Sequence, residues 1–131
     1  MKSYARYAEL KKPSWSPPAW LFGPVWTVLY IIIAVTFGFV IYQGVTAVIP
    51  LILLLPFILN LVFNFLFTPI AFGLKNNPLA LADVALTLGT LIWALIAVFP
   101  FAPWVVYANL PYLLWTCFAT ILQATVTAMN R

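Results

Sequence analysis

The sequence predicts an all-α protein, a polytopic membrane helical bundle with four transmembrane helices in a single domain, residues 1–131. Of the 131 residues, 66% are hydrophobic and 6% are charged, whereas a soluble domain carries about 25% charged residues. Between Lys12 and Arg131 the charged residues are Lys75 and Asp83. A lipid bilayer solvates such long uncharged stretches directly, so we expect a bilayer as the protein's surroundings.

The first two predicted spans are residues 20–42 and 45–67. Each has the length of about 20 residues that a helix needs to cross the hydrocarbon layer. Gln43-Gly44 separates them, because this pair favours a turn. Pro50 and Pro56 fall inside or near the second span, where we expect them to kink the helix.

The third and fourth predicted spans are residues 79–99 and 104–128. Asn76-Asn77-Pro78 precedes the third span, and Pro100 and Pro103 separate it from the fourth, since these residues favour turns or interrupt helices. Pro111 is expected to kink the fourth helix.

The Lys and Arg residues predict how the bundle is oriented. With four spans, one side of the membrane holds both termini and the middle loop, and with them every basic residue: Lys2, Arg6, Lys11, Lys12, Lys75 and Arg131. The positive-inside rule then predicts a multi-pass protein of a bacterial inner or plasma membrane with both termini in the cytoplasm. The basic residues form no stripe on a polar surface, so no nucleic-acid partner is expected.

One face of the second span carries most of its polar groups. Its members recur at intervals of three or four residues and comprise Asn60, Asn64, Phe67, Thr68 and Ala71. Such a face suits an apolar ligand that needs a few directed hydrogen bonds. Equally, the amides can bond to neighbouring helices and hold the bundle together.

Two further faces leave alternatives open. Asp83, with Thr87 and Thr90 on the same face, is either a first-turn acid favoured by the helix dipole or a proton or cation site. In the fourth span, Trp115 beside Ala119 leaves room for a flat ligand next to an indole, and also fits ordinary packing.

No catalytic or metal site is predicted. The chain has no His and two acidic residues far apart in sequence, so it offers neither a triad nor a pair of carboxylates. The lone Cys117 is expected to be a small buried hydrophobic residue.

The N-terminal region carries a motif rich in Pro and Trp. Residues 7–30 read YAELKKPSWSPPAWLFGPVWTVLY, and this stretch resembles the TspO/MBR family, the tryptophan-rich sensory and translocator proteins. Residues 60–64, 72–76, 80–83, 111–115 and 118–119 match the family in the same order.

The resemblance implies a membrane protein that binds tetrapyrroles such as protoporphyrin IX and haem, and other hydrophobic ligands, often as a homodimer. The positions that match the family's pocket are Tyr7, Pro17, Trp26, Asn60, Asn64, Phe67, Thr68, Trp115 and Ala119. Their rings would stack on a flat macrocycle, and their amides would donate hydrogen bonds to it.

The family has five spans, and the first of them precedes the region that matches Tyr7. Arg6 stands where the family usually has Trp. The expectation is therefore that the first helix is absent, either through a truncated start or in a four-helix variant.

The leading functional hypothesis is a tetrapyrrole-binding sensory or transport-related protein. One alternative is a small four-helix multidrug exporter, although the first span lacks the embedded acid that such exporters use. A second alternative is light-dependent porphyrin breakdown by redox chemistry at Trp26 and Trp115.

Overall fold

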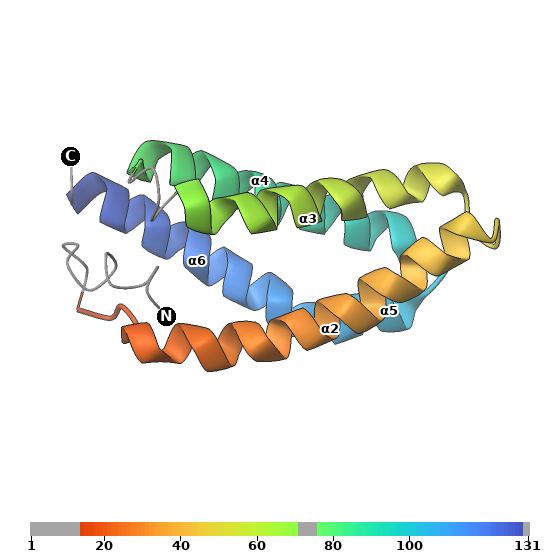
Figure 1. The fold of residues 1–131 in the computed structure, drawn as a ribbon, viewed down its shortest axis with the longest axis horizontal. Helices are drawn as coiled ribbons and strands as arrows, with labels where there is room; N and C mark the ends of the chain where they lie inside the picture. Colours follow the sequence, from red (N-terminus) through yellow and green to blue (C-terminus); the bar gives the residue numbers. More distant parts are fainter. Residues whose placement is uncertain (1–13, 71–75, 130–131) are drawn as a thin grey trace.

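The computed structural model describes residues 14–70 and 76–129, and within these ranges every regular element is a helix. The all-α prediction is therefore confirmed (Figure 1). In chain order the elements are α2 (Ala19–Val45), the 3-10 helix η2 (Leu51–Leu53), α3 (Leu54–Thr68), α4 (Asn77–Val98), α5 (Pro103–Ala108) and α6 (Leu110–Met129).

Helix α2 contains the predicted first span and extends beyond it at both ends. It starts after Pro18, whose extended backbone ends the preceding irregular segment, and it continues through Pro24. The helix passes through Gln43-Gly44 and ends at Val45. The turn that follows contains Ala47 with φ 63°, so the left-handed residue is an alanine and not the nearby glycine.

Helix α3 is shorter than the span predicted at 45–67. Residues 46–50 form the turn after α2, and η2 and α3 together make the apolar helical stretch Leu51–Phe67. At 1.5 Å per residue this stretch is about 26 Å long. Pro50 precedes η2 and Pro56 lies in the first turn of α3, where no N–H is needed. Neither proline therefore lies in the middle of α3.

Helix α4 agrees closely with the predicted third span. Its start is fixed by Asn76, whose side-chain oxygen accepts a hydrogen bond of 3.0 Å from the Leu79 amide, as a helix cap does. No acid lies in its first turn, and Asp83 is buried one turn further along, at 4% exposure. The interpretation of Asp83 as a first-turn acid is therefore wrong.

The predicted fourth span is divided into two helices at Asn109. The Asn109 side-chain amide donates to the Val105 carbonyl at 2.8 Å and to the Thr36 hydroxyl of α2 at 3.0 Å. Pro111 has no N–H to donate to the carbonyl of Tyr107, and it lies in the first turn of α6. The break between α5 and α6 therefore lies at the start of α6, and the Asn109 side chain links it to α2.

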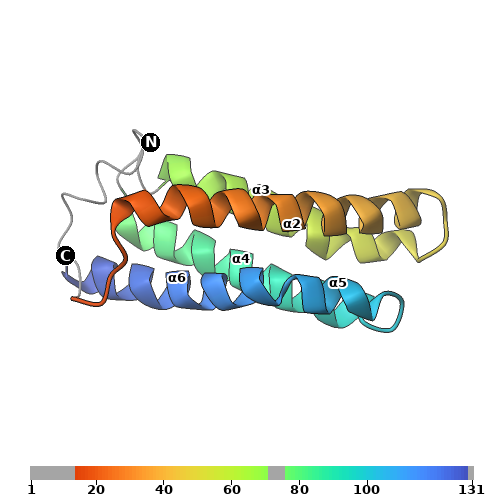
Figure 2. The same ribbon diagram turned by 90° about the horizontal axis from the view of Figure 1, so that it is seen from below.

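Helices α3, α4 and α6 pack side by side, with α4 in contact with both of the others. Helix α2 contacts η2, α3 and α5. It diverges from α3 and α6 toward its own N-terminus (Figures 1 and 2). The start of α2, the end of α3, the start of α4 and the end of α6 lie at one end of the bundle. In the sequence these four ends adjoin the segments that hold the basic residues, as the predicted orientation requires.

The exterior of the bundle is apolar. Helices α2, α4 and α6 are each long and apolar enough to cross a membrane, and large residues such as Val35, Ile96 and Leu114 are 60–70% exposed. Exposed hydroxyls in the helices bond to carbonyls of their own chain four residues earlier, as Thr27 does to Gly23 at 2.8 Å. Such a surface is stable against lipid because its polar groups are already paired.

Candidate functional site

An open apolar cleft of about 700 Å³ lies between the N-terminal half of α2 and the N-terminal half of α6. Its residues recur at helical spacing on the facing sides of the two helices, since positions three and four apart share a face. The lining consists of Pro17, Leu21, Pro24, Val25, Val28 and Leu29 on one side and Pro111, Leu114, Trp115 and Phe118 on the other.

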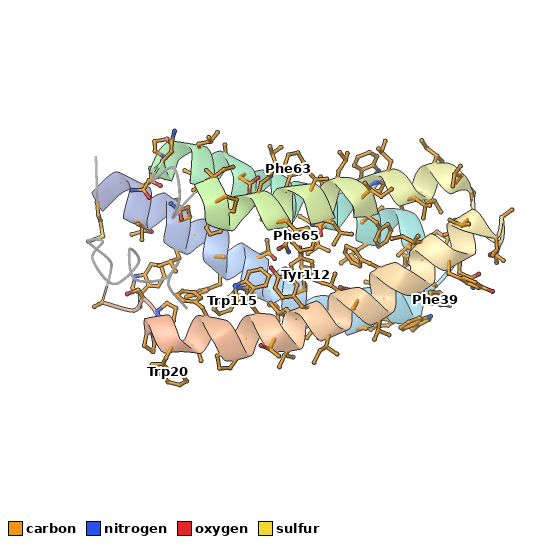
Figure 3. All side chains as sticks on the ribbon, in the orientation of Figure 1. Trp20, Phe39, Phe63, Phe65, Tyr112 and Trp115 are labelled. Atoms are coloured by element: carbon orange, nitrogen blue, oxygen red, sulfur yellow. The ribbon has the colours of Figure 1, made fainter. Side chains whose placement is uncertain are left out.

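Aromatic rings from both helices pack against one another beside the cleft, and two of them, Trp115 and Phe118, line it. Trp115 of α6 lies edge to face with Phe22 of α2, with ring centroids 5.8 Å apart, and contacts Phe118 at 5.5 Å. Trp26 of α2 contacts Tyr112 of α6 at 6.4 Å. Figure 3 shows Trp115 and Tyr112 directed from α6 toward α2. The separation between the two helices is thus bridged by rings.

The indole nitrogen of Trp115 is buried and has no hydrogen-bond partner among residues 14–70 and 76–129. A buried N–H without a partner is costly, and the large majority of such groups are paired. The indole nitrogen is therefore a buried donor on a residue whose ring lines the cleft.

Behind the rings, a network of buried polar groups joins all four long helices. The Tyr112 hydroxyl of α6 accepts from the Asn64 amide of α3 at 2.7 Å and donates to the Asn60 oxygen at 2.9 Å. The Tyr30 hydroxyl of α2 donates to the Asn64 oxygen at 3.2 Å. The Asn60 amide donates to the Thr87 carbonyl of α4 at 2.8 Å. We call Tyr30, Asn60, Asn64 and Tyr112 the amide–phenol network.

The amide–phenol network shows how the amides on the polar face of the second span are bonded. Asn60 and Asn64 are 0% and 6% exposed, and both bond to neighbouring helices. The interhelical interpretation is therefore confirmed. Neither amide lines the cleft, and their role as ligand-binding residues stays a prediction.

The structure brings some of the predicted pocket residues together and separates others. Pro17 and Trp115 line the cleft, and Trp26 packs on Tyr30 beside it, with ring centroids 5.3 Å apart. Phe67 and Ala119 are half-buried on α3 and α6. Tyr7 and the Thr68 side chain lie outside the described part of the chain, so their predicted roles stay predictions.

Sequence reasoning missed Tyr30 and Tyr112 as site residues. A signal for each was present, because Tyr30 follows Trp26 by four residues and Tyr112 precedes Trp115 by three, which places each pair on one helical face. Tyr112 is fully buried. A buried tyrosine usually needs a partner for its hydroxyl, and the buried asparagines of α3 provide it.

Comparison with known proteins agrees with this architecture. The model of the TspO/MBR family matches residues 1–129. The chain is 36% identical to the human translocator protein, and the alignment covers 95% of this chain and 75% of that protein. It is 35% identical to the tryptophan-rich protein TspO of Bacillus cereus, covering 95% and 80% of the two chains.

A further relative carries a name that refers to function. The chain is 32% identical to the tryptophan-rich sensory protein of Cereibacter sphaeroides, covering 95% of this chain and 76% of that protein. The family match extends over nearly the whole sequence and includes both helices that form the cleft. The protein therefore belongs to the TspO/MBR family.

Proposed function

We propose that the protein binds a tetrapyrrole, protoporphyrin IX or haem, in the cleft between α2 and α6, as a sensory or transport-related membrane protein. The observation that carries the proposal is an apolar cleft whose lining includes the aromatic rings of Trp115 and Phe118. Its volume of about 700 Å³ falls within the range of about 300–1,000 Å³ that small-molecule sites occupy. A flat apolar macrocycle gains most from such a wall, because its faces stack on rings.

The contacts available in the cleft define how the macrocycle would be held. The walls offer apolar surface, and the amides of Asn60 and Asn64 are already bonded to other helices. The indole N–H of Trp115 is buried and has no partner among residues 14–70 and 76–129, so it would reach a polar edge group of the ligand, such as a propionate, only if the ring turned toward the cleft. Stacking and burial of apolar surface therefore supply most of the affinity in this proposal.

The cleft is also placed to receive its ligand from the bilayer. It opens between two helices that the sequence places in the membrane, and its lining residues are almost entirely apolar. A lipid-dissolved porphyrin reaches such an opening without crossing a polar barrier. This route suits both a sensor of membrane porphyrin and a protein that moves it.

Titration of the purified protein in detergent with protoporphyrin IX tests the proposal through quenching of tryptophan fluorescence. We expect saturable quenching in the parent protein. Trp115→Ala removes a ring of the wall and should weaken binding roughly tenfold or more. Trp115→Phe keeps a ring but removes the N–H, so its loss should be smaller.

Trp93→Phe is the matched control, because Trp93 lies on α4 and is 46% exposed away from the cleft lining. Its affinity should equal that of the parent. Equal affinities for the parent and for Trp115→Ala, or the absence of saturable quenching, would contradict the proposal.

The homodimer implied by the family resemblance belongs to the same proposal. The bundle presents extensive apolar surface on all its long helices, which is compatible with lipid or with a second copy. Light scattering of the detergent-solubilised protein measures its mass directly. A mass of one chain at all concentrations would exclude the dimer in detergent.

A further inference from the structure

Asp83 is a buried acid that the cleft does not use. It lies in the second turn of α4, inside a helix long enough to span the membrane, and is 4% exposed. Its Oδ2 atom is buried and has no hydrogen-bond partner within residues 14–70 and 76–129. It is also the sole acidic residue of those ranges, since the other acid of the chain is Glu9.

The neighbouring hydroxyls on α4 do not compensate the carboxyl group. The Thr87 hydroxyl donates to the backbone oxygen of Asp83 at 3.0 Å. The Thr90 hydroxyl is directed to the carbonyls of Leu86 and Thr87, at 2.8 Å and 3.1 Å. Both groups are therefore committed to the helix backbone, and Oδ2 gains nothing from them.

The elements packed against α4 supply no positive charge within the described ranges. Those elements are η2, α3, α5 and α6, and their titratable side chains are Tyr107, Tyr112 and Cys117. Residues 14–70 and 76–129 contain no Lys, Arg or His. An ionised carboxylate in this setting would carry an uncompensated charge, which is far costlier to bury than a neutral acid.

We propose that Asp83 is a proton-binding site inside the membrane bundle, with its carboxyl group protonated at neutral pH. The proton removes the charge that the surroundings fail to balance. The site also lies one helical turn from the Thr87 carbonyl that holds the Asn60 amide. Loss of the proton would place a negative charge one helical turn from this attachment of the amide–phenol network, which would give the network a means of responding to pH.

Reaction with dicyclohexylcarbodiimide in membranes tests the proposal, because this apolar reagent modifies carboxyl groups that are protonated and shielded from water. The stable product is an acylurea, detected by mass spectrometry on the peptide that contains Asp83. We expect the adduct at neutral pH, a yield that falls as the pH rises, and complete loss of the adduct in Asp83→Asn.

Two matched variants identify the reacting group and exclude an ion pair. Glu9→Gln removes the other acid and should leave the adduct yield unchanged. Lys75→Gln removes the nearest lysine in sequence and should also leave it unchanged. An adduct confined to Glu9, or one that appears at Asp83 only in Lys75→Gln, would show that Asp83 is ionised and would overturn the proposal.

Infrared spectroscopy provides a second readout that needs no chemical reagent. The difference between the parent and Asp83→Asn should contain a protonated-carboxyl C=O band that shifts in deuterium oxide. A carboxylate band at neutral pH would overturn the proposal. If Asp83→Asn fails to fold, the labelled peptide of the parent still decides the question. No porphyrin is present in either experiment, so the result is independent of the proposed function.

Discussion

At the scale of single residues, the Tyr112 hydroxyl has the largest structural role in the amide–phenol network. It is fully buried and is placed between two amides of the same helix, accepting from Asn64 and donating to Asn60. Asn60 continues the network to α4, and Asn64 continues it to Tyr30 of α2. The wall of the cleft is thereby anchored to the rest of the bundle through one phenol.

Tyr112→Phe should destabilise the protein and leave its fold intact. Hydrogen bonds between membrane helices contribute about 0.6 kcal/mol on average and up to about 1.7, and this hydroxyl makes two. The change also leaves the amide N–H of Asn64 and the side-chain oxygen of Asn60 without this partner. We therefore expect the free energy of unfolding to fall by about 1 to 3 kcal/mol. Reversible unfolding in mixed micelles measures the difference.

Tyr107→Phe serves as the control, because Tyr107 is 61% exposed on α5 and should tolerate the loss of its hydroxyl. If Tyr112→Phe proved as stable as Tyr107→Phe, the hydrogen bonds of the amide–phenol network would contribute nothing measurable to stability.

The sequence predicts part of the site at this scale. The Pro and Trp motif of residues 7–30 identifies Pro17, the family match at 111–115 identifies Trp115, and the spacing of Asn60 and Asn64 correctly places both on one face. The partner of these amides is not predictable from spacing alone, because Tyr112 lies about 50 residues further along the chain and on another helix. An asparagine amide in a membrane helix can bond to a neighbouring helix or to a ligand, and its position in the sequence does not distinguish the two.

At the scale of helices, Gly44 explains how α2 meets the start of α3. A methyl group added at Gly44 would lie 2.7, 2.8 and 2.9 Å from three side-chain carbons of Leu54, well inside contact distance. Leu54 is itself buried, so it has little room to move. Glycine is present here because it allows the two helices to approach closely.

Gly44→Ala should therefore destabilise the bundle by about 1 to 3 kcal/mol, the usual cost of overpacking a core. Combining it with Leu54→Ala should restore part of the loss relative to the sum of the two single changes, because the smaller side chain makes room for the methyl group. The same unfolding measurement compares the four proteins.

Gly38→Ala is the matched control in the same helix, since nothing lies within 4 Å of a methyl group placed there. Alanine is the better helix former by up to about 1 kcal/mol, so this variant should be neutral or slightly stabilised. Equal destabilisation by both alanines would rule out contact with Leu54 as the cause.

Gly44 also shows why helix boundaries are harder to predict than helices. Long apolar runs identify the helices, because a membrane requires every backbone group to be paired. Gln43-Gly44 predicts a turn, yet the helix continues and the turn places Ala47 at positive φ. A glycine selected for close packing and a glycine selected for a turn are identical in sequence.

At the scale of the whole molecule, the helix ends adjoining all six basic residues lie at one end of the bundle. The positive-inside rule predicts that this end faces the cytoplasm. In a Cys117→Ser background, which removes the lone cysteine, Ser14→Cys and Val48→Cys introduce thiols at opposite ends. An impermeant maleimide should label Val48→Cys in intact cells and Ser14→Cys only after the membrane is permeabilised.

Both positions are exposed, so unequal labelling reports sidedness and not burial. Labelling of Ser14→Cys alone in intact cells would reverse the orientation. Labelling of both before permeabilisation would show mixed insertion.

The divergence of α2 from its neighbours has a consequence for selectivity. Helix α2 is joined to η2 and α5 at one end and departs from α3 and α6 toward the other (Figure 1), and the cleft lies along the departing half. Such an arrangement would let the free half of α2 shift without breaking its contacts at the joined end. If the protein binds a macrocycle as proposed, molecules of different thickness should therefore be accommodated by this half of the helix and not by the rest of the bundle.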